Sequence, residues 1–308
     1  MTWFLIFTMI ALLLCIGWGL DYYYFAKLNH KIGFPVITCI ALASSIVLAI
    51  TSLNKGASSI LSSAQASPLN PANPDERQLL NVVKEMSIAS GLPMPQVYII
   101  HDDDPNAFAT GKDPQHSYVA ITEGLLKTLD RDELQGVIAH EMSHIRNYDI
   151  RFMMVVAAFI GVIVLVSDFA AHGLRFRSFS GERDRSSNEK NPAAAVFFIV
   201  WIITIVLAPL ITRIMAMMVS RKREYLADAS AVELTRNPLA LAKALQKLDN
   251  AAAPTTSIKR GVAHLCVVDP LERSVNEKEG FLADLFATHP PIQKRIMLLK
   301  AMAYQRTN

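Results

Sequence analysis

The sequence predicts an α+β membrane protein with about four transmembrane helices and a mostly helical soluble domain that contains a small β-sheet. Two observations support this fold class. The 308 residues are 52% hydrophobic and have a positive mean hydropathy, which is too apolar for an ordinary soluble domain. Long apolar runs also alternate with polar segments that contain short helix and strand patterns. We therefore expect a soluble domain that membrane segments divide in two.

Four apolar runs each approach or exceed the roughly 20 residues that a helix needs to cross a bilayer. They cover residues 3–20, 34–53, 152–171 and 194–219. The first run has no basic segment before it and no small-residue cleavage site after it, so we expect a retained anchor rather than a signal peptide. In the fourth run, Pro209 and Arg213 leave the end of the span undefined.

These runs divide the chain into four parts. Residues 1–53 contain two spans, 54–150 begin with a linker and form the first part of the soluble domain, 151–220 form a membrane hairpin, and 221–308 complete the soluble domain. The elements predicted before the hairpin are a helix at 75–90, strands at 96–100 and 117–121, and helices at 123–129 and from Asp130 or Asp132 to about Tyr148. After the hairpin we expect helices at 221–235 and 239–250, a long loop over 254–280 with a short strand at 262–268, and a last helix that THPP opens at 288–291.

Charge and cysteine content exclude several classes of protein. The net charge is only +3 at pH 7, and the basic residues are scattered or lie beside apolar runs, where lipid headgroups would meet them. We therefore expect no nucleic-acid binding. Cys15 and Cys39 fall inside apolar runs and Cys266 stands alone, so neither a disulfide framework nor a cysteine zinc site is expected.

The run HEMSH at 140–144 is an H-E-x-x-H signature. On a helix, His140 and His144 project from one face at a distance that suits zinc chelation. Glu141 lies about 100° around the same helix, so it can act as a base on water at the metal without competing for the metal. The signature therefore predicts a catalytic site with one Zn²⁺ per chain.

A catalytic zinc needs a third protein ligand and an open position. A histidine ten residues after His140 is excluded because that position is Ile150. Glu224 is the best-placed carboxylate, since two predicted spans separate it from His144 and return the chain to the same side of the membrane. A solvated charge among basic neighbours is the alternative reading of Glu224. Asp228, one turn later, could accept the second N–H of a zinc-bound histidine or could lie on the helix surface.

Four motifs that span nearly the whole chain, in the same order, resemble the HtpX-type membrane zinc metallopeptidases. They are PNAFATG at 105–111, HEMSHIRNYD at 140–149, EYLAD at 224–228 and THPPIQKRI at 288–296. The resemblance implies a split zincin-like catalytic domain of the gluzincin type among four spans. It also implies that Glu224 is the third ligand and that Asp228 is a partner of a zinc-bound histidine.

The resemblance further implies an edge strand that aligns the substrate. Its residues would be Asn106, Ala107, Phe108 and Ala109. A plain loop that packs Phe108 into the core is the alternative. For His289, the resemblance suggests a catalytic role in stabilising the oxyanion or in binding substrate. A histidine at a helix start, restrained by the two prolines that follow it, explains this position equally well.

The expected reaction is the hydrolysis of peptide bonds in unfolded polypeptides or damaged membrane proteins, close to the bilayer surface. The resemblance implies a quality-control and stress-response role in a bacterial inner membrane. Alternatives are the processing of prenylated C-termini, for which the sister branch resembles a seven-span chamber, and a catalytically silent scaffold with a structural zinc. Basic residues are equal in number on the two sides of the predicted spans, so only the resemblance and the unpaired cysteines favour a cytoplasmic active site. The sequence does not predict an oligomeric state.

Overall fold

The computed structural model describes residues 34–155, 221–251, 266–267 and 290–305, together with a few single residues before residue 34. The chain divides into two compact units. One comprises Met1–Thr51 with Ala158–Ile214, and the other comprises Ser52–Ala157 with Met215–Asn308. Every strand that the structure describes lies in the second unit, as do all the described helices apart from the first part of α2.

Helix α2 (Val36–Ser63) contains the second predicted span and continues beyond it. The linker that we predicted to begin at residue 54 is therefore wrong over its first ten residues. The serines there do not break the helix because they return hydrogen bonds to its backbone: the Ser58 and Ser63 hydroxyls each donate to a carbonyl three residues earlier, at 2.8 Å. Ile60 and Leu61 then pack onto the sheet, which stabilises the extension.

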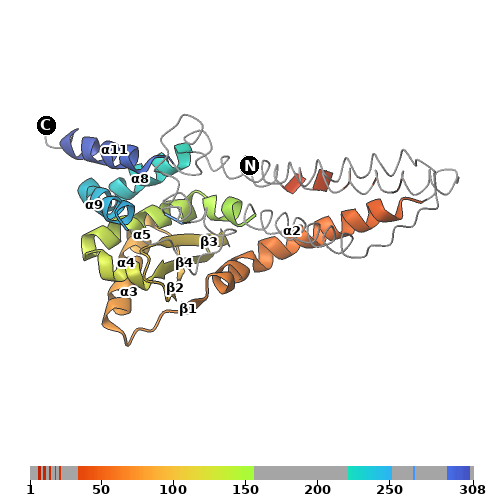
Figure 1. The fold of residues 1–308 in the computed structure, drawn as a ribbon, viewed down its shortest axis with the longest axis horizontal. Helices are drawn as coiled ribbons and strands as arrows, with labels where there is room; N and C mark the ends of the chain where they lie inside the picture. Colours follow the sequence, from red (N-terminus) through yellow and green to blue (C-terminus); the bar gives the residue numbers. More distant parts are fainter. Residues whose placement is uncertain are drawn as a thin grey trace, which may run out of the picture. The chain divides into compact units, whose positions relative to one another are not determined.

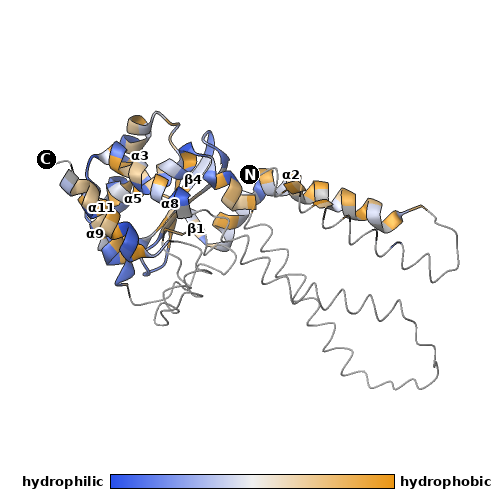
Figure 2. Ribbon diagram, turned by 90° about the horizontal axis from the view of Figure 1, so that it is seen from above, coloured by the Kyte–Doolittle hydropathy of each residue, from blue (hydrophilic) through white to orange (hydrophobic). Residues whose placement is uncertain are grey.

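Among the described residues, only the stretch Thr38–Ser63 of α2 is long and apolar enough to cross a membrane by length and composition. Its 26 residues would extend roughly 39 Å as a helix, more than the hydrocarbon core of a bilayer. The apolar side chains of its first part, such as Ile40 and Val47, are exposed, and the helix is largely orange in Figure 2. The spans predicted at 3–20, 152–171 and 194–219 lie outside the described residues, apart from a few positions.

Four strands form one mixed sheet in the order β1-β2-β4-β3. They are β1 (Ala66–Pro68), β2 (Gln96–Ile100), β3 (Ala107–Asp113) and β4 (His116–Thr122). The central pair, β2 and β4, is parallel, and both outer pairs are antiparallel. The two predicted strands are confirmed as β2 and β4. The sequence gives no sign of β1, which has only three residues and lies in the predicted linker. β3 forms one edge of the sheet.

The predicted helices of the soluble part are confirmed. They are α3 (Pro74–Ser90), α4 (Glu123–Thr128), α5 (Arg131–Arg146), α8 (Arg221–Thr235), α9 (Pro238–Asp249) and α11 (Ile292–Gln305). The structure also decides between the two possible caps of α5. The Asp130 side chain accepts the N–H of Glu133, and the Glu133 carboxylate accepts the N–H of Asp130, which is a capping box.

Helix α5 lies between the sheet on one side and helices α8 and α9 on the other (Figure 1). One face of the sheet, including Val119 and Ile121, packs under α5, while Phe108 on the other face packs against the end of α2. Gly136 lets α9 approach closely, because a Cβ there would lie 3.1 Å from the backbone of Leu241. Close packing on both sides holds α5 in place, and α5 contains the H-E-x-x-H signature.

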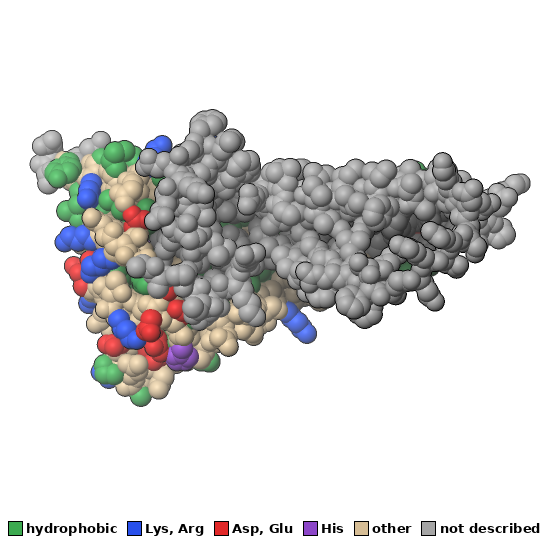
Figure 3. Space-filling model, in the orientation of Figure 1, with side chains coloured by type: hydrophobic (Ala, Val, Ile, Leu, Met, Phe, Trp, Pro, Cys, Tyr) green, Lys and Arg blue, Asp and Glu red, His purple; other side chains and the backbone are tan. Residues whose placement is uncertain are grey.

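Charged side chains are mixed on the face of the second unit that Figure 3 shows. Lysine and arginine residues lie among aspartate and glutamate residues there. Ion pairs in the second unit include Lys127–Asp103 and Arg131–Glu85. Nucleic-acid-binding proteins gather basic side chains into a patch or stripe. The described part of this face has no such stripe.

Candidate active site

The three predicted metal ligands come together between α5 and α8. His140 and His144 lie one turn apart on α5, and Glu224 lies in the first turn of α8, which packs along α5. One possible ligand atom from each of the three residues lies within 4.8 Å of the other two. His140 and Glu224 are buried, and His144 is half-buried, so the group opens to one side.

The distances between the donor atoms fit a tetrahedral ion. The two Nε2 atoms of His140 and His144 are 3.2 Å apart, and the two Glu224 carboxylate oxygens lie 3.5 Å from them, with Oε2 near His140 and Oε1 near His144. Zinc bonds of about 2.1 Å at tetrahedral angles place neighbouring ligands roughly 3.4 Å apart. The three side chains can therefore hold a zinc ion after a small adjustment of the Glu224 carboxylate.

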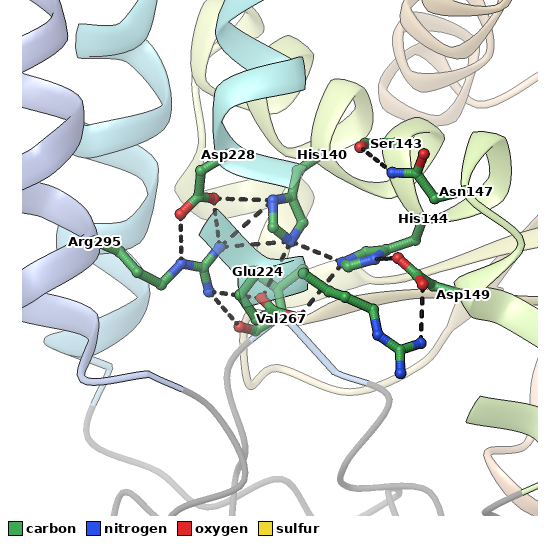
Figure 4. A network of polar contacts seen from close by, with 10 residues as sticks. His140, Ser143, His144, Asn147, Asp149, Glu224, Asp228, Val267 and Arg295 are labelled. Atoms are coloured by element: carbon green, nitrogen blue, oxygen red, sulfur yellow. Dashed lines mark hydrogen bonds and ion pairs between the residues drawn. The ribbon is translucent and has the colours of Figure 1, made fainter. Parts of the chain in front are cut away.

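A carboxylate contacts the other ring nitrogen of each histidine (Figure 4). His140 Nδ1 is 3.0 Å from Asp228 Oδ1, and His144 Nδ1 is 3.1 Å from Asp149 Oδ2. A carboxylate at Nδ1 accepts the N–H there and leaves the lone pair of Nε2 directed at the metal position. Both histidines are thus held in the tautomer that binds zinc.

Arg295 of α11 completes the site on the side of His140. Its side chain is 1% exposed and forms a two-bond contact with Asp228, with Nε donating to Oδ2 at 2.8 Å and Nη2 to Oδ1 at 2.7 Å. Its Nη1 lies 3.3 Å from the Glu224 carboxylate. A buried cation beside two buried carboxylates reduces the cost of their burial, so Arg295 helps to hold both in place.

Burial and these contacts shift several pKa values in the metal-free protein. Burial alone would lower the pKa of His140, but hydrogen bonds with Asp228 and Glu224 raise it to about 9. Burial alone would raise the pKa of Asp228, but the charge of Arg295 and the hydrogen bonds with His140 and Arg295 lower it to about 2. Asp228 is therefore ionised throughout the physiological range, and His140 binds a proton when no metal competes for its position.

Glu141 lies in a pocket that the metal-ligand residues also line. The pocket is lined by Ala109, His140, Glu141, His144 and Glu224, among others. Burial raises the pKa of the Glu141 carboxyl, while the two histidines oppose the rise. A backbone hydrogen bond with Ala109 of β3 also lowers this pKa and fixes the carboxylate against the sheet. A carboxyl group with a raised pKa beside a metal position is suited to accept and return a proton.

The predicted substrate segment coincides with the edge of the sheet. Ala107, Phe108 and Ala109 begin β3, and Asn106 precedes it. The Phe108 side chain is fully buried in the cluster with Ile60, and the backbone of the same residue lies in the edge strand β3. Asn106 holds the start of the strand: its N–H donates to the Thr122 hydroxyl, and its side-chain oxygen accepts the Ala107 N–H.

His289 lies outside the described residues, so its catalytic role stays a prediction. Two other residues of the site were missed in the sequence. Asp149 was missed because we expected α5 to continue to about Tyr148. The helix ends at Arg146, and Tyr148 has a positive φ of 58°, which turns Asp149 back toward His144.

Arg295 was missed because nothing in its local spacing separates it from Lys294, its exposed neighbour. Its partner Asp228 lies 67 residues earlier in the chain. The one available sign was its position within the motif THPPIQKRI.

Comparisons with known proteins show the family to which the chain belongs. The sequence model described as peptidase family M48 matches residues 73–303. The chain is 39% identical over 301 residues to a protease HtpX homolog of Streptococcus gordonii, covering 98% of this chain and 96% of the relative. It is 45% identical over 234 residues to a protease HtpX homolog of Thermoanaerobacter pseudethanolicus, covering 75% of this chain and 74% of the relative.

A solved structure shares the fold. The crystal structure of S. mikatae Ste24p aligns with a TM-score of 0.51 at 18% identity, over 95% of this chain and 62% of that protein. This likeness supports a mostly helical fold with a small mixed sheet. From the family match and the relatives, the chain belongs to peptidase family M48 and is an HtpX-type metallopeptidase.

Proposed function

We propose that this chain cleaves extended segments of unfolded or damaged membrane proteins, with one zinc ion held by His140, His144 and Glu224. The observation that carries the proposal is the convergence of three possible ligand atoms, all within 4.8 Å of one another, beside the buried carboxyl group of Glu141. The name of the relatives, protease HtpX homolog, is consistent with a quality-control role in a bacterial inner membrane.

In this proposal, zinc supplies Lewis acidity that polarises the scissile carbonyl and makes water acidic enough to react at neutral pH. Glu141 takes the proton of the attacking water on its carboxylate and passes it to the leaving amine, for which its raised pKa is suited. Asp228 and Asp149 keep the two histidines in the tautomer that presents Nε2.

The edge of the sheet supports extended polypeptides as the substrate class. The N–H and C=O groups on the outer side of β3 can pair with a peptide, which would then lie across the pocket that Glu141 and the metal ligands line. Helix α2 leads from the candidate span into β1 of the same sheet within three residues of its end. This short connection favours substrates that lie at or near the membrane surface.

The test uses the detergent-purified full chain, prepared without zinc and then reconstituted with zinc. Its zinc content and its cleavage of unfolded casein are measured. We expect one zinc per chain and zinc-dependent cleavage in the parent. Glu141→Gln should keep its zinc and lose turnover by about 10²–10⁴-fold, because it removes the base alone. Glu224→Ala should bind zinc poorly.

Asp132→Asn is the matched control, since Asp132 is an exposed carboxylate on the same helix as Glu141. It should keep both zinc and activity. Stoichiometric zinc with cleavage that does not depend on Glu141 would replace the peptidase mechanism with a structural role for the metal.

We also propose that the chain is multi-pass and that the active site faces the cytoplasm. The test replaces the three cysteines by serine and introduces Asn81→Cys at an exposed position of α3. A membrane-impermeant maleimide should label this cysteine only after the cells are permeabilised. Labelling in intact cells would place the catalytic part on the outer side.

A further inference from the structure

The outer side of β3 is already in contact with another part of this chain. The N–H of Val267 donates to the carbonyl of Ala107 at 2.9 Å, so a short bend at 266–267 lies against the sheet edge. Ala107 belongs to the segment that the proposed function assigns to substrate. One of the backbone groups that a peptide would use is therefore occupied by the protein itself.

A second contact holds Val267 through its carbonyl group. The carbonyl oxygen of Val267 accepts a hydrogen bond from Arg295 Nη1 at 3.3 Å. The N–H and C=O of one residue are thus bound by the Ala107 carbonyl and the Arg295 guanidinium, which we call the Ala107–Arg295 clamp. Any peptide residue except proline could satisfy these two contacts, because both involve only backbone groups of the bound residue.

The bend also fills space beside the reactive groups. Cys266 and Val267 are 1% and 4% exposed, and both line the pocket that contains His140, Glu141 and Glu224. Their side chains point to opposite faces of the sheet: Cys266 packs in the cluster with Phe108, and Val267 in the cluster under α5. Alternating side chains and edge pairing are what a bound peptide would show at this position.

From these contacts we propose that Val267 is an internal occupant of a substrate-residue site, the Ala107–Arg295 clamp, and that a polypeptide must displace it in order to be cleaved. The inference rests on the proposed function, because it adds self-inhibition to the same site. A protein that is mostly in the occupied state binds substrate more weakly, in proportion to the fraction of molecules whose site is open. The segment therefore sets the threshold at which the peptidase accepts a polypeptide.

The first experiment measures the reactivity of the Cys266 thiol, which the clamp buries. In a Cys15→Ser, Cys39→Ser and Glu141→Gln background, Cys266 is the sole cysteine and bound substrate is not cleaved. The zinc-loaded protein is labelled with a maleimide, with and without unfolded casein whose thiols are blocked. Casein is used at a concentration at which the anisotropy of a fluorescent sample shows that it is bound.

We expect bound casein to raise the rate of Cys266 labelling by about fivefold or more, since it replaces at least one buried hydrogen bond of the bend. Acetohydroxamate is the control probe, because it binds a metal without extending along the strand; it should leave the rate unchanged. An unchanged or lower rate with bound casein would overturn the proposal, since the bend would then stay in place beside substrate.

The second experiment removes one contact of the clamp. Val267→Pro lacks the N–H that Ala107 accepts, so kcat/KM for casein should rise about fivefold at full zinc occupancy. Val267→Ala keeps the N–H and should give a smaller rise. Thermal unfolding of both variants checks that they are folded. A lower kcat/KM in a folded, zinc-loaded Val267→Pro protein would show that the bend is part of the productive site and would overturn the inference.

The two proposals fail differently. If cleavage is independent of zinc and of Glu141, the proposed function fails. If cleavage depends on both but Cys266 stays protected and Val267→Pro is no more active than the parent, only the self-inhibition fails.

Discussion

The two histidines of the site have the same kind of support but lie in different surroundings. His140 contacts Asp228, which Arg295 binds, and His144 contacts Asp149, which Arg223 binds at 3.0 Å. Each series is a histidine, a carboxylate and an arginine. Figure 4 shows Asp228 and Arg295 on the side of His140, and Asp149 on the side of His144. The first series is almost fully buried, whereas the side chains of His144 and Arg223 are each 17% exposed.

This difference determines what each series contributes. Water can partly solvate Arg223 or Asp149 when its partner is removed, so the series around His144 mainly orients that ring. No such compensation exists for Arg295, which lies between two carboxylates in the interior. The series around His140 should therefore stabilise the fold as well as the site, since a buried charge that loses its partner is strongly destabilising.

Removing each arginine in turn gives the largest expected difference. Arg295→Gln removes the buried guanidinium and leaves only the protonated His140 ring to balance Asp228 and Glu224, and we expect the metal-free protein to lose about 3–5 kcal/mol of stability. Arg223→Gln removes a partly solvated pair and should cost about 1 kcal/mol or less. Chemical unfolding in detergent, followed by circular dichroism without metal, measures both. Equal losses would contradict the assignment of a structural role to the buried series alone.

The dependence of zinc affinity on pH tests the electrostatics of the His140 side. In the metal-free protein the pKa of His140 is raised from 6.5 to about 9, so its proton stabilises the fold fully below pH 6.5 and that contribution is lost as the pH rises to 9. Zinc must displace this proton. We therefore expect the apparent zinc association constant to rise by about tenfold per pH unit between 6.5 and 8 and more slowly above that, or roughly 50-fold from pH 7 to 9.

Competition with a buffered chelator over this range gives the slope. The parent curve should level off near pH 9. A curve that is flat from pH 7 upward would mean that His140 is already neutral in the metal-free site, and that Asp228 and Glu224 do not hold its proton.

Asp228→Asn and Asp149→Asn compare the two carboxylates directly. Asp228→Asn weakens the orientation of His140 and leaves Arg295 without its two-bond partner, so zinc affinity should fall by about 10–100-fold. Asp149→Asn acts on a half-buried ring and should reduce affinity less than tenfold. Asp228→Asn should also move the levelling-off of the zinc affinity to lower pH, because Asp228 is one of the two groups that raise the pKa of His140. Isothermal titration at fixed pH resolves the order of the two variants.

The sequence predicted the side of the site that depends on helical spacing. His140 and His144 are one turn apart, and Glu224 and Asp228 repeat that spacing on α8, so a periodic pattern could place all four. Asp149 and Arg295 depend on features without a period. Asp149 depends on a single left-handed residue after α5, and Arg295 on a contact with Asp228, which lies 67 residues earlier on another helix. The helices and the two central strands were likewise predictable from apolar spacing. The short edge strand β1 and the extension of α2 were not, because tertiary packing forms them.

Loss of the capping box of α5 should affect the series around His140 and the series around His144 equally. Asp130 begins the helix that carries both histidines, and its side chain accepts the N–H of Glu133. Asp130→Ala should cost about 1 kcal/mol of stability, as the loss of an N-terminal cap does, measured by the same unfolding experiment. Because the cap lies more than two turns before His140, the relative zinc affinities of the Asp228 and Asp149 variants should be the same in this background. A change in their ratio would mean that the start of α5 also adjusts the position of the ligands, so that the difference between the two series would reflect the helix as well as their burial.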